Sequence, residues 1–250
     1  MAKLVHASDL KSDEEILAGS SPVPPTMNPW LRSFSYSSLK QFETCPRQYG
    51  EITVHRNFKN VFTSPRGDYG DRLHKTAEAY IHYGGTIDAD FEFLRPTFEV
   101  LKNSRGRCLT EHKMAISHVG DALEWNSVSR WFQGIADIVI VSDSPIAKIL
   151  DFKTGDVRYA DTDQLELMSL LVFAHYPHVK YVKGRLLFVL SQQMRDRNVD
   201  IKERERLMQK YRERDARRLA AIEANNFPAK ESGLCRKHCV VLTCPHNGRK

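Results

Sequence analysis

The 250-residue sequence has little cysteine and no long apolar run. Its five cysteines are too few for the disulfide framework of a small secreted protein. No stretch approaches the roughly 20 apolar residues that a membrane-spanning helix needs. Lys3 is not followed by the apolar segment of a secretory signal. We therefore expect a cytoplasmic protein without a membrane partner.

Negative charge is in slight deficit, with 37 Lys and Arg against 31 Asp and Glu and a sequence pI near 9.0. Such an excess suits an anionic partner, and nucleic acid is the usual one. Residues 195–224 are expected to contain a long basic helix. Its C-terminal half is predicted to contact nucleic-acid phosphates through Arg212, Arg214, Arg217 and Arg218. The alternative is a solvated face with i,i+4 pairs such as Glu213 with Arg217.

The chain divides into a flexible arm, residues 1–32, and one α/β domain, residues 33–250. Four prolines between positions 22 and 29 break regular structure in the arm. Apolar residues at helical spacing predict helices at 36–45, 69–83, 162–175 and 197–224. β-forming runs predict strands at 108–116, 131–141, 146–152 and 181–190. This order predicts a mixed sheet with flanking helices.

Two of these strands carry the chemistry. Asp137 interrupts an otherwise apolar strand, and Asp151 and Lys153 lie two residues apart, so they project from the same face of the next strand. A turn centred on Ser144 would place Asp137 directly across from Asp151, with Cβ atoms about 5 Å apart. The alternative is a surface hairpin with a cross-strand ion pair.

Two carboxylates at that distance repel each other unless a cation lies between them. Mg²⁺ or Mn²⁺ prefers oxygen ligands and would supply that cation. Lys153 would then lie beside the metal, where it could orient or deprotonate a water molecule and neutralise charge on a phosphate. Glu111 lies on the neighbouring strand. It could orient Lys153 or the metal-bound water, or be an ordinary exposed carboxylate.

Four motifs in order resemble the RecB-like, CRISPR-adaptation-type branch of the PD-(D/E)XK nuclease superfamily. Residues 35–49 read Ser-Tyr-Ser-Ser-Leu-Lys-Gln-Phe-Glu-Thr-Cys-Pro-Arg-Gln-Tyr, and residues 70–74 read Gly-Asp-Arg-Leu-His. Residues 134–137 read Gly-Ile-Ala-Asp, followed by Asp-Phe-Lys-Thr-Gly at 151–155. Residues 164–168 then match a Gln-x-x-x-Tyr motif, with Met168 in place of the tyrosine. We expect Met168 to be a core residue.

The resemblance implies a restriction-endonuclease-like core, αβββαβ, and a metal-dependent DNA exonuclease. It implies His74, Asp137, Asp151 and the carbonyl of Phe152 as metal ligands. Lys153 would be the catalytic base or charge stabiliser, and Gln164 would support the ligands or position the substrate. The alternatives are a non-catalytic DNA-end-binding protein and a restriction-type endonuclease. Recombination, repair or replication proteins are the expected partners, in the host cytoplasm if a phage encodes the chain.

A cysteine-cluster tail, residues 233–246, is the second signal, because clustered cysteines in a reducing compartment suggest metal ligands. The resemblance implies a [4Fe–4S] cluster held by Cys45, Cys235, Cys239 and Cys244. The main alternative is zinc held by the three tail cysteines with His238 or His246. Cys108 lies in an expected strand and is interpreted as a small core residue.

Overall fold

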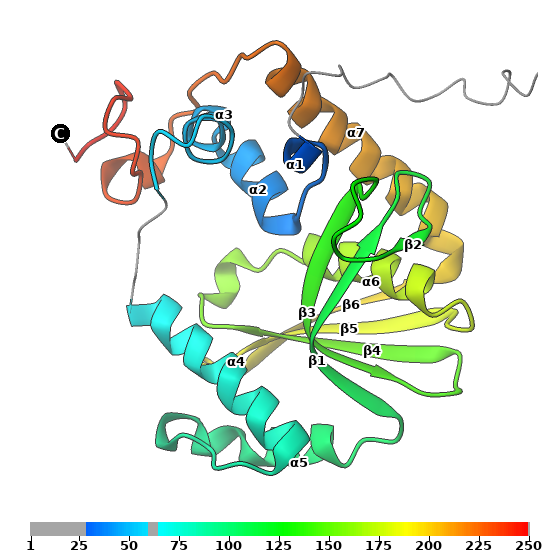
Figure 1. Cartoon of the computed structure of the whole chain (residues 1–250). Coiled ribbons are helices and arrows are strands. Elements are labelled where there is room, and N and C mark those ends of the chain that lie inside the picture. The colour runs from blue at the N-terminus through cyan, green and yellow to red at the C-terminus, as the bar shows by residue number, and fades with distance from the viewer. Residues whose placement is uncertain (1–28, 60–64, 250) are drawn as a thin grey trace, which may run out of the picture.

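The computed structural model describes residues 29–59 and 65–249 (Figure 1). Most of the expected arm lies outside these residues, and its last four form a short helix, α1 (Pro29–Arg32). The centre is a six-stranded sheet of β1 (Arg107–Ile116), β2 (Ala122–Leu123), β3 (Phe132–Val141), β4 (Ile146–Lys153), β5 (Tyr181–Phe188) and β6 (Gln193–Asp200). None of the helices in the described ranges is long and apolar enough to span a bilayer.

The strand order is β2-β1-β3-β4-β5-β6. Only β4 and β5 are parallel, and the other neighbours pair antiparallel. Helix α6 (Asp163–His175) makes the crossover between β4 and β5, as a parallel pair requires. The mixed sheet and its flanking helices confirm the predicted α/β class.

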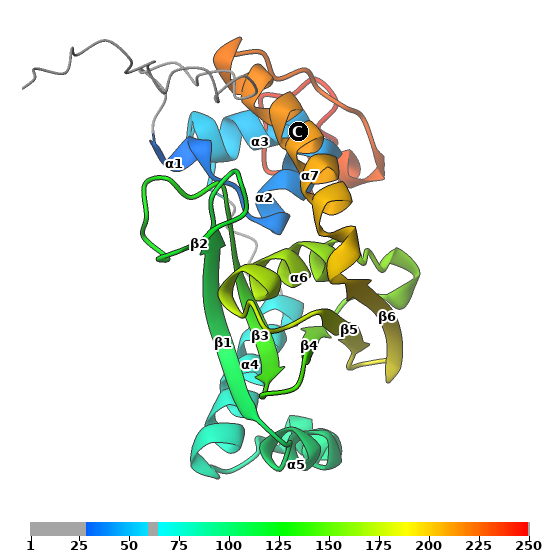
Figure 2. The same ribbon diagram turned by 90° about the vertical axis from the view of Figure 1, so that its right-hand side faces the viewer.

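Helices cover both faces of the sheet (Figure 2). One face packs on α6, and α7 (Arg204–Glu223) packs on the outer side of α6. Nearly every residue of α6 from Leu165 to Phe173 is therefore buried. On the other face, α4 (Pro65–Tyr83) and α5 (Arg95–Lys102) pack against residues of β3, β4 and β5. A turn of 3₁₀ helix, Ala89–Leu94, leads into α5.

The apolar residues at helical spacing after Ser35 lie in α2 (Tyr36–Thr44). Ser35 is its N-cap and exchanges hydrogen bonds with Ser38, while Leu39 and Phe42 are buried. Cys45 ends the helix, and Pro46 begins α3 (Pro46–Tyr49) at a position where no backbone N–H is needed. A π-helical turn, Gly50–Val54, follows. Pro46 therefore redirects the chain directly after Cys45.

The expected helices and strands are present, and the structure differs from the expectation in several places. Helix α4 begins four residues earlier than expected, and Arg95–Lys102 forms the helix α5, which was not expected. The expected basic helix is wrong before residue 204, because Gln193–Asp200 forms the edge strand β6 instead. This strand buries only Val199, so it lacks the alternating apolar pattern that reveals a strand. Its pairing with β5 decides its conformation.

Gly134 of β3 explains why methionine occupies position 168. A Cβ atom added at Gly134 would lie 2.6 Å from Cε of Met168 and 3.1 Å from Cδ1 of Leu171. Met168 is 4% exposed and fills the space that the glycine leaves. The expectation that Met168 is a core residue is confirmed.

Gly134→Ala should lower the free energy of unfolding by about 1–3 kcal/mol, because the new methyl group overpacks this contact. Gly155→Ala is the matched control, since a Cβ atom there meets nothing within 4 Å. Urea denaturation would measure both variants. Adding Met168→Leu, which withdraws the Cε methyl group, should recover part of the loss. Equal stability of the two alanine variants would contradict this account.

Candidate functional site

The β3–β4 hairpin has the register that the sequence predicts. Ile140 pairs with Lys148 and Ile138 with Leu150, so Asp137 and Asp151 are opposite each other at the next position. The pairing ends there, and Oδ2 of Asp137 accepts a hydrogen bond of 2.7 Å from the backbone N–H of Phe152. The two carboxylates therefore lie at the open end of the hairpin.

Asp151 is part of a closed polar triangle. Its Oδ2 lies 2.6 Å from Nζ of Lys153, and its Oδ1 accepts a 2.6 Å hydrogen bond from Nε2 of Gln164. Lys153 in turn donates to Oε1 of Gln164 at 2.6 Å. Asp151 is 4% exposed, whereas the Lys153 side chain is 31% exposed. The triangle thus holds the ammonium group at the solvent side of the carboxylate.

Asp137 belongs to a second group, with His74 of α4 and Glu111 of β1. Nδ1 of His74 lies 3.0 Å from Oε1 of Glu111 and 3.5 Å from Oδ1 of Asp137. Within the described part of the chain, no other three His, Cys, Asp or Glu side chains place ligand atoms within 4.8 Å of one another. Nitrogen and carboxylate donors at this spacing suit a divalent cation such as Mn²⁺.

The sequence interpretation left Glu111 open between a group that supports the site and an ordinary exposed carboxylate, and the structure places it beside His74. The φ of Glu111 is +45°, in the left-handed region, and it interrupts the β1–β3 pairing between Thr110 and His112. By register it faces Asp137 at this gap. A non-glycine residue in this conformation costs about 1–3 kcal/mol and is typical of functional sites. No periodicity in the sequence signals such a backbone conformation.

Of the predicted metal ligands, the structure brings His74 and Asp137 together and places Asp151 across from Asp137. Phe152 contributes its N–H to Asp137, and the role of its carbonyl stays a prediction. Gln164 contacts Asp151 and Lys153, as a supporting group would.

Burial of the two aspartates makes their charges costly. Burial, and then the negative charge of Asp151, raises the pKa of Asp137 well above its ordinary value. Burial also raises the pKa of Asp151, against the opposing effect of Lys153. Protonation or a bound cation relieves this repulsion. A bound divalent ion would therefore stabilise the two charged carboxylates.

Metal-free protein should lose stability as the pH rises above 3.8, the ordinary aspartate value. The folded state holds the Asp137 proton more tightly than the unfolded state does, so deprotonation favours unfolding until the raised pKa is passed. Asp137→Asn keeps an acceptor for the Phe152 N–H and removes the charge. In EDTA this variant should melt at a higher temperature than wild type at pH 7.

Mn²⁺ should reverse the order of the two melting temperatures. It should raise the melting temperature of wild type and leave that of Asp137→Asn almost unchanged. Differential scanning fluorimetry from pH 5 to pH 8, with EDTA or with Mn²⁺, would measure both effects. The account fails if the metal-free variant and wild type show the same dependence on pH.

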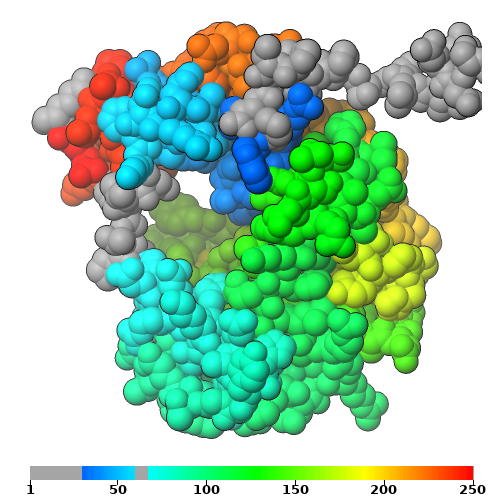
Figure 3. All heavy atoms as spheres, viewed as in Figure 1, coloured from blue at the N-terminus to red at the C-terminus, as the bar shows by residue number. Residues whose placement is uncertain are grey.

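A hollow lies between α2 and α3 on one side and α4 on the other (Figure 3). Its back is formed by part of the segment that links β4 to α6. This segment starts directly after Lys153, the last residue of β4. The hollow therefore opens beside the end of β4 that carries Lys153.

The four cysteines of the predicted cofactor site line one small cavity of about 10 Å³. Cys45 comes from the end of α2, and Cys235, Cys239 and Cys244 come from the tail. His246 also lines the cavity, whereas His238 does not. Burial raises the pKa of the Cys239 thiol, and the three other thiols act in the same direction. Cys108 instead packs beside the cluster of α4 and α5, as expected of a core residue.

The predicted phosphate contacts of α7 are wrong for two of four arginines. Arg218 is fully buried and pairs with Asp215 at 2.7 Å, while Arg214 is 12% exposed and pairs with Glu43 and Asp163. Both guanidinium groups are paired with carboxylates inside the fold. Arg212 binds Glu205 and the His118 carbonyl, and Arg217 is exposed. For these two residues phosphate contact stays a prediction.

A sequence model of the PD-(D/E)XK nuclease superfamily matches residues 33–245. Among solved structures, SSO0001 is 14% identical, with a TM-score of 0.44 over 86% of this chain and 87% of the other. A protein from Eubacterium rectale described as a candidate exonuclease is 15% identical, with a TM-score of 0.43 over 82% and 86%. A search of curated proteins finds no match.

Proposed function

The chain belongs to the PD-(D/E)XK nuclease superfamily, and from this premise we propose that it is a metal-dependent exonuclease acting on DNA. The observation that carries the proposal is the complete set of Asp137, Asp151 and Lys153 at the open end of one hairpin. A non-catalytic DNA-end-binding protein would have no need to bury two repelling carboxylates beside a lysine.

His74, Glu111 and Asp137 would hold Mg²⁺ or Mn²⁺, with Asp151 next to them across the hairpin. When bound, the ion activates a water molecule and stabilises charge on the scissile phosphate. Asp151 and Gln164 hold Nζ of Lys153 in place, where it can accept a proton from that water or neutralise the phosphate. The Asp137–Phe152 hydrogen bond keeps the ligand strand and the lysine strand in register.

Asp151→Ala and Lys153→Ala should each lower the rate of DNA cleavage by about 10²–10⁴-fold, because each removes a group that acts in the transition state. Lys148→Ala is the matched control, since Lys148 is exposed on the opposite face of β4. End-labelled single- and double-stranded DNA, with Mg²⁺ or Mn²⁺, would provide the rates. Wild-type rates in Lys153→Ala would overturn the assignment.

A covalently closed circular DNA in the same assay separates the two modes of cleavage. An exonuclease degrades the linear substrates and leaves the circle intact, whereas a restriction-type endonuclease cuts the circle. The matched family region spans nearly the whole described chain, which leaves no separate recognition domain within it. This favours action at DNA ends.

The proposal includes a [4Fe–4S] cluster at Cys45, Cys235, Cys239 and Cys244. Four thiolates are the usual ligands of such a cluster, and these four line one cavity. Tetrahedral zinc, with Zn–S bonds of about 2.3 Å, would need sulfur atoms about 3.8 Å apart. No three of these sulfur atoms lie that close together in the described structure.

Cys45→Ser should remove the visible absorption of anaerobically purified protein and lower its melting temperature. The site would join residues 190 positions apart and so restrict the unfolded chain, and its loss would remove that stabilisation. Cys108→Ser is the control, because that cysteine lies outside the cavity. Iron, sulfide and zinc analysis would accompany the spectra. Colourless protein with one zinc ion, unaffected by Cys45→Ser, would point to the tail cysteines with His246.

A further inference from the structure

Gln164 must be placed accurately in the proposed catalytic centre, because it contacts two of its residues. It is the second residue of α6, and its side-chain amide contacts both Asp151 and Lys153 at 2.6 Å. A shift of the first turn of α6 would break both contacts. The N-cap residue, Thr162, makes no side-chain capping hydrogen bond. The first turn must therefore be held by other groups.

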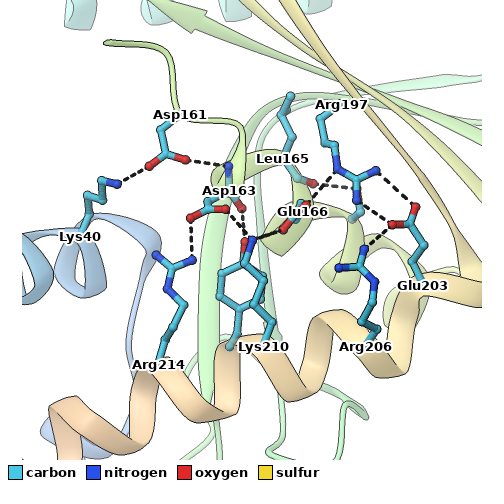
Figure 4. A network of polar contacts seen from close by, with 12 residues as sticks. Lys40, Asp161, Asp163, Leu165, Glu166, Arg197, Glu203, Arg206, Lys210 and Arg214 are labelled. Atoms are coloured by element: carbon cyan, nitrogen blue, oxygen red, sulfur yellow. Dashed lines mark hydrogen bonds and ion pairs between the residues drawn. The ribbon is translucent and has the colours of Figure 1, made fainter.

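Asp161 holds the backbone of this turn, since its Oδ1 accepts a 2.9 Å hydrogen bond from the Asp163 N–H. The groups that hold the Asp163 side chain come from α7 (Figure 4). Nζ of Lys210 lies 2.7 Å from Oδ1 of Asp163, and Nη1 of Arg214 lies 2.5 Å from Oδ2. The hydroxyl of Tyr211 donates to the Asp163 carbonyl at 3.1 Å. Three side chains of one helix thus hold both the carboxylate and the backbone of Asp163.

Arg214 is itself held from the far side. Its Nε and Nη2 donate to the two carboxylate oxygens of Glu43 in α2, each at 2.7 Å. Such a bidentate pair is strong and fixes the plane of the guanidinium group. Lys210 also binds Glu166, one turn further along α6. Arg214 therefore joins α2 to the first residue of α6 in a defined geometry.

We propose that Arg214 is a positioning residue of the catalytic centre, which acts by holding Asp163 and thereby Gln164 against Asp151 and Lys153. This inference rests on the proposed nuclease function. Arg214 touches no reacting group, so its effect must pass through Gln164. If Arg214 only stabilised the fold, its effect on cleavage would not depend on Gln164, so this dependence distinguishes the two roles.

The test is a double-mutant cycle between positions 214 and 164, measured as steady-state cleavage of end-labelled DNA in Mg²⁺. Arg214→Ala should lower kcat roughly ten- to hundredfold with KM changed less than threefold, as expected of a small displacement of a supporting group. Arg214→Lys keeps the charge without the fork and should lie between Arg214→Ala and wild type. In a Gln164→Ala background, Arg214→Ala should cause no further loss.

Gln209→Ala is the matched control, because Gln209 is exposed on the same helix and donates to Glu213, one turn further along α7. Asp163→Asn, which keeps the shape of the side chain, repeats the cycle if Arg214→Ala does not fold. Melting temperatures are recorded for every variant. Losses that multiply in the double variant, or a kcat unchanged by Arg214→Ala, would overturn the inference. Absence of cleavage by wild type would instead overturn the proposed function.

Discussion

Two aspartates face each other at the end of the β3–β4 hairpin, and their carboxylates repel each other. The other contacts of the site can be understood from that repulsion. The backbone pairing of β3 with β4 ends at Ile138 and Leu150, and Asp137 and Asp151 face each other at the next position. Each carboxylate has different neighbours: Asp137 lies beside His74 and accepts a hydrogen bond from the Phe152 N–H, whereas Asp151 contacts Lys153 and Gln164. A cation bound between these groups would resolve the repulsion that remains.

The neighbours come from opposite faces of the sheet. Helix α4 supplies His74 from one face, and α6 supplies Gln164 from the other. The two hydrophobic cores therefore set the two halves of the site independently, one with α4 and α5 and one with α6 and α7. Only the hairpin belongs to both halves. A change of register in β3–β4 would move Asp137 away from Asp151 and from the Phe152 N–H, because alternate residues point to opposite faces.

The hairpin chemistry could be predicted from sequence because it depends on local rules. The turn at Ser144 and the two-residue period of strands determine which side chains meet. The sequence left the role of Glu111 open, since its place beside His74 depends on a left-handed backbone that only the tertiary fold maintains. Charge counting also misjudged Arg214 and Arg218, because a basic helix looks the same whether its partners are phosphates or buried carboxylates. Strand β6 was missed because pairing with β5, not apolar periodicity, determines it.

The arginines of α7 show where part of the positive charge of the chain is used. Glu43 lies one residue before the end of α2, and Cys45 follows that helix. Nζ of Lys230, from the segment before the cysteine tail, donates to the Glu43 carbonyl at 2.9 Å, while Arg214 binds the Glu43 carboxylate. The end of α2 thus lies between the cysteine site and the first turn of α6. Order at the cysteine site and order at Gln164 therefore share this one short helix, through the charged contacts of Glu43 and through Leu39, which packs in the same core cluster as Leu165 of α6.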